Sequence, residues 1–114
     1  MCENNYQNRF IKFVERNITY VISTKDILYI TTIPCTRKSL IVTIHSEITI
    51  SKSLKEIKKL LDDDFMYSHR ACIVNINKIQ CVNFKEHIIT FDNGKTVELL
   101  SNRSTKNIMN KIRY

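Results

Sequence analysis

Apolar and polar residues alternate along most of this chain, which is the period-two pattern of strands with one buried face. The alternation is clearest at 9–14 and 18–22, on either side of a predicted turn at Arg16 and Asn17. Pro34 ends a later strand because proline cannot donate to a strand ladder. Asn93-Gly94 predicts a type I′ hairpin turn, since both residues tolerate a positive φ. The strands predicted after residue 22 are 27–31, 40–44, 48–50, 71–75, 79–84, 87–91 and 95–100.

Two helical segments are predicted among these strands. Ser53 and Glu56 form a capping box, in which the hydroxyl and the carboxylate satisfy free backbone N–H groups. A short terminal helix is predicted from Ile108 and Ile112, which are one turn apart. The apolar stripe of the first helix is Leu54, Ile57, Leu60 and Leu61, and Asp62 to Asp64 end it. Many short strands with one or two peripheral helices are typical of a sandwich or barrel.

The length and composition restrict the class of protein. A chain of 114 residues has room for one core, so we predict a single domain over 1–114 with its core at about 9–112. No apolar run approaches the roughly 18–20 residues of a membrane span, and the polar start carries no signal-peptide core. A cytoplasmic protein with no membrane partner is the simplest interpretation. With one Gly and one Pro, the chain lacks the glycines that Rossmann and P-loop phosphate sites need.

The cysteines and histidines do not indicate a reactive or metal site. The cysteines Cys2, Cys35, Cys72 and Cys81 form no zinc-ligand pattern with His45, His69 and His87. Cys72 and Cys81 lie among apolar residues, which predicts that both are buried. Cys72 and His69 lack the third, orienting group that a nucleophile–base pair needs. We therefore expect no enzyme activity, no cofactor and no metal.

The distribution of charge is more informative than the net charge of +7. The stretches 27–46 (after Asp26), 65–85 and 99–114 contain basic residues and no Asp or Glu. This segregation is what a polyanion-binding face requires, because interspersed carboxylates would repel phosphates. Basic residues can also simply keep a surface soluble, so charge alone leaves both interpretations open.

Three arginines sharpen the nucleic-acid hypothesis. Arg37, Arg70 and Arg103 each fall in a predicted loop of an acid-free stretch, between small polar or basic neighbours. The planar guanidinium fits the O6 and N7 acceptors of guanine, whereas lysine and histidine suit phosphates. One such arginine is ordinarily a solvated side chain; three together favour DNA binding by loops, not by a recognition helix.

The segment 65–79 resembles the signature of the LytTR DNA-binding domain family. The shared elements are an aromatic residue, then His69-Arg70, then a hydrophobic stretch that ends in Val74-Asn75 and a further isoleucine. The resemblance extends over nearly the whole chain, because further elements of the family follow in the expected order. These elements are the segment 26–30, the capping box, Asn93-Gly94 and Arg103. Small residues at Ala71-Cys72 depart from a Ser-Phe pair common in relatives.

The resemblance implies a mainly β fold, an elongated sandwich of short antiparallel sheets with one short central helix and a short C-terminal helix. It also implies the effector domain of a bacterial response regulator of a two-component system, of the kind that controls quorum-sensing and virulence genes. Such domains insert loops into successive major grooves of double-stranded DNA, commonly at paired direct repeats that hold two copies. The chain is too short to include a receiver domain, which is an expected partner if this is the end of a longer protein.

Residue roles carried over from the resemblance fall into two groups. The expected base contacts are Arg37 or Lys38, Arg70 and Arg103, and the loop that contains Pro34 is about one residue longer than in some relatives. The expected phosphate contacts are His69, Lys52, Ser53, Asn102 and Lys106. Asn75 is interpreted as structural, with its amide fixing the next turn.

The alternative hypothesis is a non-enzymatic β-rich RNA-binding or protein-interaction module that uses the same basic face. Stacking of unpaired bases requires exposed aromatic side chains. The pattern instead predicts core-facing positions for most aromatics, namely Phe10, Phe13, Tyr29, Phe65, Phe84 and Phe91. This weighs against RNA.

Overall fold

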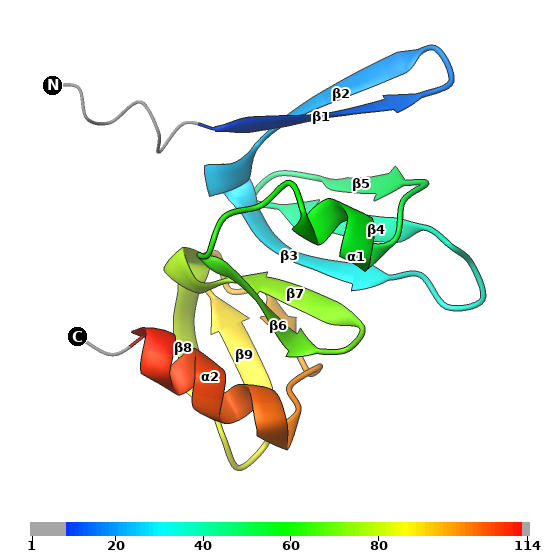
Figure 1. Ribbon diagram of the computed structural model, residues 1–114. Helices are drawn as coiled ribbons and strands as arrows, with labels where there is room; N and C mark the ends of the chain where they lie inside the picture. Colours follow the sequence, from blue (N-terminus) through cyan, green and yellow to red (C-terminus); the bar gives the residue numbers. More distant parts are fainter. Residues whose placement is uncertain (1–8, 113–114) are drawn as a thin grey trace, which may run out of the picture.

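The computed structural model describes residues 9–112, which form three antiparallel sheets and two helices (Figure 1). The first sheet is the hairpin of β1 (Phe10–Glu15) and β2 (Ile18–Ser23). The central sheet has the order β5-β4-β3-β7-β6, with β3 (Ile27–Thr32), β4 (Ser39–Thr43), β5 (Glu47–Ile50), β6 (Phe65–His69) and β7 (Cys72–Asn75). The third has the order β10-β9-β8, with β8 (Ile79–Asn83), β9 (Ile88–Phe91) and β10 (Thr96–Val97). The helices are α1 (Leu54–Lys58) and α2 (Asn102–Ile112), and η2 (Thr24–Asp26) and η3 (Ile76–Lys78) are 3-10 turns.

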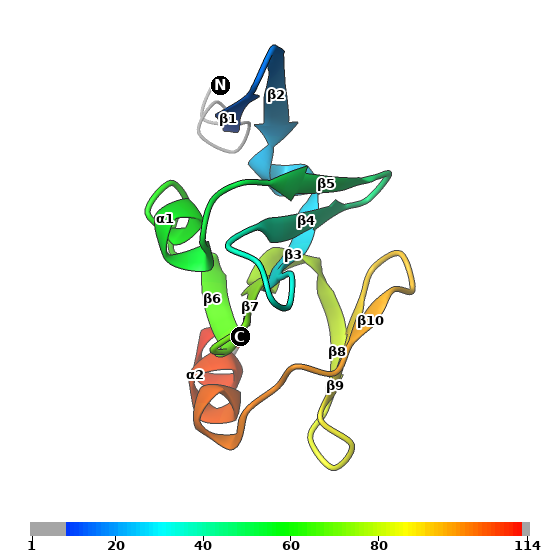
Figure 2. The same cartoon turned by 90° about the vertical axis from the view of Figure 1, so that its right-hand side faces the viewer.

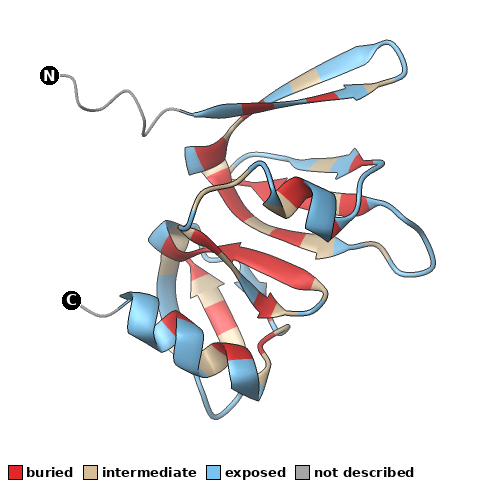
Figure 3. Cartoon of the chain, viewed as in Figure 1, coloured by how far each residue is buried: buried red, intermediate tan, exposed pale blue. Residues whose placement is uncertain are grey.

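A hydrophobic core lies on each face of the central sheet, so the molecule is layered as the sequence predicts. On one face Ile30, Ile41 and Ile73 pack with α1 and with the inner residues of the β1–β2 hairpin. On the other face Leu28 and Val42 pack with the third sheet and with Ile108 of α2. Figure 3 shows the buried positions concentrated along this sheet. The mainly β class, the short antiparallel sheets, the central helix and the C-terminal helix are confirmed.

Asn75 has the structural role that the sequence predicts. Its buried side-chain amide donates to the carbonyl of Ile27 at 2.8 Å, and its Oδ1 accepts from the N–H of Asn77 at 3.1 Å. These bonds join the end of β7 to the start of β3 and begin η3. A buried polar side chain is tolerated here because its donor and its acceptor are both used.

Three residues that the sequence predicts to be buried are exposed. Phe10 is 61% exposed because it is three residues from the buried Phe13, and an odd separation places two strand residues on opposite faces. Phe84, at 39% exposure, lies beyond the end of β8 in the turn to β9. Cys81 is also exposed, since a register shift between Ile79 and Cys81 interrupts the alternation of β8.

Two predictions about backbone geometry also need correction. Gly94 has φ 91° and Asn93 has no positive φ, so the turn between β9 and β10 is not type I′, which requires a positive φ at both central residues. The Asn93 side chain instead accepts from the N–H of Lys95 at 3.1 Å. The helix opened by the Ser53 capping box is confirmed, but α1 ends at Lys58, before the Leu60-Leu61 part of the predicted stripe.

Candidate nucleic-acid interface

Antiparallel pairing brings three separate connections to one edge of the central sheet. The C-terminal end of one strand lies beside the N-terminal end of its neighbour. The β3–β4 loop (33–38), the segment after β5 (51–53) and the β6–β7 turn (70–71) therefore lie at the same edge. We call these residues, with 101–103, the site edge. It is on the right in Figure 1, and Figure 2 looks onto it.

The β3–β4 loop is held by its own hydrogen bonds. The N–H of Ile33 donates to the carbonyl of Lys38 at 3.0 Å, and the hydroxyl of Thr36 donates to the carbonyl of Ile33 at 2.8 Å. The Thr36 hydroxyl also accepts from the N–H of Lys38 at 3.0 Å. The backbone is thus fixed, while the side chains of Arg37 and Lys38 are exposed to solvent.

The β6–β7 turn displays Arg70 at the end of a bulged strand. The register of β6 against β7 shifts between Tyr67 and His69, which leaves Ser68 as the extra residue of a bulge. The segment 65–69 is thus strand β6, so Ser68 and His69 are not loop residues. The N–H of Ala71 donates to Nδ1 of His69 at 3.1 Å, so Nε2 carries the proton of the neutral ring and can donate outward. Arg70 is exposed.

The bulge at Ser68 attaches the start of α2 to the site edge. The buried hydroxyl of Ser68 donates to the carbonyl of Leu99 at 2.6 Å, and its carbonyl accepts from the N–H of Ser101 at 2.7 Å. Ser101 in turn caps α2, because its hydroxyl accepts from the N–H of Ser104 at 3.1 Å. Arg70 follows Ser68 by two residues, and Arg103 follows Ser101 by two residues. Because Ser68 and Ser101 are bonded directly, the two arginines share one framework although 33 positions separate them in the sequence.

The prediction that Arg103 lies in a loop is wrong. Arg103 lies in the first turn of α2 (Asn102–Ile112). The serine at 101 acts as a helix cap, so the polar run 101–104 begins the helix instead of preceding it. Asn102 and Arg103 bring the free backbone N–H groups of a helix start to the edge, and such groups favour anions. Lys106 is exposed on the second turn of the same helix.

Lys52 and Ser53 follow β5 and lie beside the β3–β4 loop. Ser39, which follows Lys38 in the sequence, has a buried hydroxyl that donates to the carbonyl of Lys52 at 2.6 Å. Arg37, Lys38 and Ser53 line one surface hollow. In the capping box the N–H of Ser53 donates to the Glu56 carboxylate at 2.9 Å, which lowers the pKa of Glu56. Glu56 thus places a negative charge next to Ser53, so Lys52 is the better placed of these two predicted phosphate contacts.

The comparisons with known proteins identify the family and the fold. The family model described as the LytTr DNA-binding domain matches residues 17–113, which is most of the chain. The chain belongs to this family. A solved structure, the LytTr DNA-binding domain of a putative methyl-accepting/DNA response regulator from Bacillus cereus, has the same fold with a TM-score of 0.70. It is 22% identical and the match covers 90% of this chain and 94% of that one. No curated protein matches the chain in sequence.

This chain is therefore a LytTr DNA-binding domain, and the LytTr family is a family of DNA-binding domains, not of enzymes. Within residues 9–112, no three His, Cys, Asp or Glu side chains are grouped so that they could hold a metal ion. The helices of this LytTr domain, in the same range, are too short or too polar to span a membrane.

The cations of the LytTr site edge form no ion pair with a carboxylate of the described residues. Within residues 9–112, the only pair with nitrogen and oxygen within 4.0 Å is Lys95–Glu47, and it involves none of the predicted site residues. Two carboxylates that lie outside the acid-free stretches nevertheless reach this edge, Glu56 and Glu15. No local pattern places Glu15 or the neighbouring Arg16 at this edge, because the hairpin that carries them meets the edge only in the folded chain.

Proposed function

We propose that this LytTr domain recognises a specific duplex DNA sequence through the site edge. The β3–β4 loop, the β6–β7 turn and the start of α2 enter successive major grooves on one side of the duplex. In this proposal the domain is the effector part of a bacterial transcriptional regulator, of the quorum-sensing or virulence type. It acts with a receiver domain where it is part of a longer two-component protein.

The observation that carries the proposal is the convergence of three exposed arginines from distant parts of the chain. Arg37, Arg70 and Arg103 are attached to a common framework by the Thr32–Ala71 backbone bond of 3.1 Å and by the Ser68–Ser101 bond of 2.7 Å. All three side chains are exposed, and none pairs with a carboxylate of residues 9–112. Exposed, unpaired guanidinium groups on a fixed backbone are suited to bidentate bonds with guanine.

The dimensions of the domain support contact with more than one groove. Its principal extents are 45 × 44 × 24 Å, and one turn of B-form DNA is about 34–36 Å long. In Figure 2 the β3–β4 loop, the β6–β7 turn and the start of α2 follow one another from top to bottom along the edge. A single thin domain can therefore lie along one side of a duplex. Two copies on paired direct repeats would then cover a longer operator.

The roles of the side chains follow from their chemistry. We assign base contacts to Arg37 or Lys38, Arg70 and Arg103. Phosphate contacts are assigned to His69 through Nε2, to Lys52, and to Asn102 with the free N–H groups of the helix start. Ser53 and Lys106 complete the phosphate set. These contacts fix the orientation of the domain on the duplex, and the arginines read the sequence.

Selection of bound sites from random duplex DNA tests this function. We expect a defined motif, and tandem copies about one helical turn apart if two domains bind side by side. On the selected site Arg70→Ala should cost about 1–3 kcal/mol of binding free energy while the circular dichroism spectrum is unchanged. Unchanged specific binding by a folded Arg70→Ala variant would contradict the proposal.

A competition experiment separates DNA binding from the alternative, an RNA-binding module on the same face. The selected duplex and a single-stranded RNA of the same sequence compete for the domain in one gel-shift series. We expect the duplex to win, because the exposed phenylalanines, Phe10 and Phe84, lie outside the site edge and, among residues 9–112, Tyr67 is the only exposed aromatic beside it. Preference for the single strand would favour the RNA hypothesis.

A further inference from the structure

The β1–β2 hairpin brings one more cation to the site edge. Its tip points to the same side as the β3–β4 loop (Figure 1). The carboxylate of Glu15 fixes this position: its two oxygens accept from the N–H of Ser51 at 3.0 Å and from the Ser51 hydroxyl at 2.9 Å. Arg16, the next residue, is exposed at the tip. The family match begins only at residue 17, so it does not include Arg16.

The surroundings of Arg16 are basic. It lines one surface hollow together with Lys38 and Ser51. The hydrogen bonds from Ser51 lower the pKa of Glu15, and Lys38 and Lys52 lower it further. The single carboxylate that lines the hollow is bonded to Ser51 and stays ionised. Two cations, Arg16 and Lys38, line the same hollow, and Lys52 is near enough to act on Glu15. This is a favourable arrangement for an anion that approaches from solvent.

The backbone conformation at the tip gives no reason for an arginine. Arg16 has φ 58° and Asn17 has no positive φ, which is the φ pattern of a type II′ hairpin turn. Glycine is the favoured residue at that first central position, because a side chain there is strained. Arg16 also has no carboxylate within 4.0 Å among residues 9–112. Neither the turn nor an ion pair within residues 9–112 uses this side chain.

We propose that Arg16 makes an outer contact with a phosphate of the DNA backbone, on the side of the β3–β4 loop away from Arg70 and Arg103. This inference rests on the proposed function and extends the bound length of the duplex by one anchoring point. The contact is to the backbone, so it adds affinity equally for every sequence and does not change the preferred motif.

Arg16→Gly is the variant that tests this contact, because glycine suits the turn. We expect its midpoint of unfolding to equal or exceed that of the original chain. The slope of log K against log salt should become shallower by about 0.9, which is about fivefold in affinity at 0.15 M salt and about fifteenfold at 0.05 M. Arg16→Lys should retain most of the slope. Lys25→Ala removes an exposed cation from η2, at the opposite end of β3, and should change nothing.

A second arm uses the length of the duplex. In this arm the selected site is shortened base pair by base pair from each end. At one flank the original chain should lose affinity before Arg16→Gly does. Once the duplex is too short to reach Arg16, the two proteins should bind with equal affinity. An unchanged salt slope in a folded Arg16→Gly variant would overturn the proposal. If Arg70→Ala still weakened specific binding in the same assay, the proposed function would stand without this contact. If no duplex were bound specifically by the original chain, both would fail.

Discussion

The two edges of the central sheet differ in charge and in the use of their polar groups. The site edge carries the cations Arg37, Lys38, Lys52, Arg70 and Arg103 and no carboxylate of its own. The neighbouring residues that share its hollows add Arg16, Glu15 and Glu56. The far edge, where η2, the β4–β5 turn (44–46), residues 59–64 and η3 lie, carries mostly carboxylates. Its charged residues, with those of the neighbouring β9–β10 turn, are Asp26, Glu47, Asp62, Asp63, Asp64 and Asp92, against Lys25, Lys59, Lys78 and Lys95.

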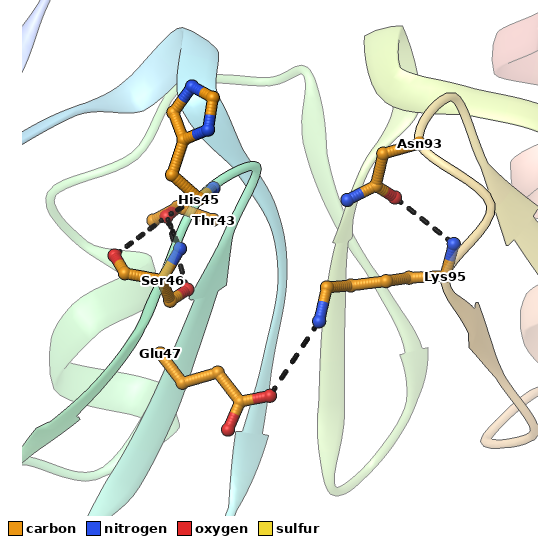
Figure 4. Close-up of polar contacts among 6 residues, drawn as sticks. All are labelled: Thr43, His45, Ser46, Glu47, Asn93 and Lys95. Atoms are coloured by element: carbon orange, nitrogen blue, oxygen red, sulfur yellow. Dashed lines mark hydrogen bonds and ion pairs between the residues drawn. The ribbon is translucent and has the colours of Figure 1, made fainter.

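Polar groups of the far edge satisfy one another. The hydroxyl of Thr43 lies 3.0–3.1 Å from the N–H, hydroxyl and carbonyl groups of Ser46. These contacts close the β4–β5 turn (Figure 4). Glu47 pairs with Lys95 at 3.8 Å across to the β9–β10 turn. At the site edge, hydrogen bonds fix the backbone and leave the cationic side chains exposed. The contrast supports the proposal that the site edge binds DNA, because there a fixed backbone carries cations that pair with no carboxylate of residues 9–112.

The largest expected effect comes from removing cations of the site edge. Arg37→Ala combined with Arg103→Ala should weaken binding to the selected duplex by about 2–6 kcal/mol, since each base-reading arginine contributes about 1–3 kcal/mol. The far-edge double variant Lys25→Ala with Lys78→Ala lowers the net charge by the same amount. We expect it to bind within about twofold of the original chain, because its lysines lie away from the phosphates. Fluorescence anisotropy titrations measure both.

Equal losses in the two double variants would mean that net charge, and not the site edge, determines binding. A change of fold would be detected as a changed circular dichroism spectrum or unfolding midpoint, and such a variant would be replaced by the glutamine version of the same sites.

The sequence predicts most of the fold because its signals are local. The capping box at Ser53, the alternation of the strands and the bond between the Asn77 N–H and the Asn75 side chain all depend on neighbouring residues. The bond from Asn75 to Ile27, 48 positions away, is not a local signal. What it does not predict depends on distant contacts or on a single shift of register. The bulge at β8 exposes Cys81, and the serine at 101 becomes a helix cap only once Ser68 fixes the chain before it.

The sequence predicts a basic face, but it does not predict how the segments of that face are brought together. Arg70 follows from the family signature and Arg103 from its order in the chain, but their common framework depends on the Ser68 bulge. Arg16 was predicted only as part of a turn. Its place beside Lys38 depends on the bonds between Glu15 and Ser51, which are 36 residues apart. No local pattern can indicate a contact over that separation.

Cysteine reactivity gives a second, smaller contrast, between the surface and the interior of the sheet. Burial raises the pKa of the Cys72 thiol from 9.0 to about 11, whereas Cys35 and Cys81 are exposed. At pH 8 the thiolate fraction of Cys72 is thus about a hundredfold lower than that of a thiol with pKa 9.0. Iodoacetamide should therefore alkylate Cys35 and Cys81 first, as followed by mass spectrometry of the peptides. The selected duplex should protect Cys35, in the loop of Arg37, and leave Cys81 unprotected.

The same raised pKa makes stability depend on pH in a definite direction. The folded chain holds the Cys72 proton more tightly than the unfolded chain does. The contribution of this proton to the free energy of unfolding is therefore complete below pH 9 and is lost as the pH rises toward 11. Urea unfolding of Cys72→Ala should show a weaker decline over this range than the original chain. An identical decline in both, or early alkylation of Cys72 in the folded domain, would contradict the burial of this thiol.

Two serines at opposite edges provide the smallest and most specific test. The hydroxyl of Ser68, fully buried, donates to the carbonyl of Leu99 at 2.6 Å, so Ser68→Ala leaves that carbonyl without its partner and should cost about 1–3 kcal/mol of unfolding free energy. The hydroxyl of Ser23, at the far end of β2, is buried and has no hydrogen-bond partner among residues 9–112. Ser23→Ala should therefore stay within about 0.5 kcal/mol of the original chain or be slightly more stable.

The DNA affinities of these two variants decide whether the bulge at Ser68 serves only stability. At a temperature where both are folded, Ser68→Ala should bind the selected duplex more weakly than Ser23→Ala does, because the segment that leads into α2 loses one of its two attachments to β6. This loss of affinity should be smaller than the loss caused by Arg103→Ala. Adding Ser68→Ala to Arg103→Ala should cause no further loss, since both changes act through the Arg103 side chain. Additive losses in the combined variant would show that Ser68 affects binding by some route other than the position of Arg103.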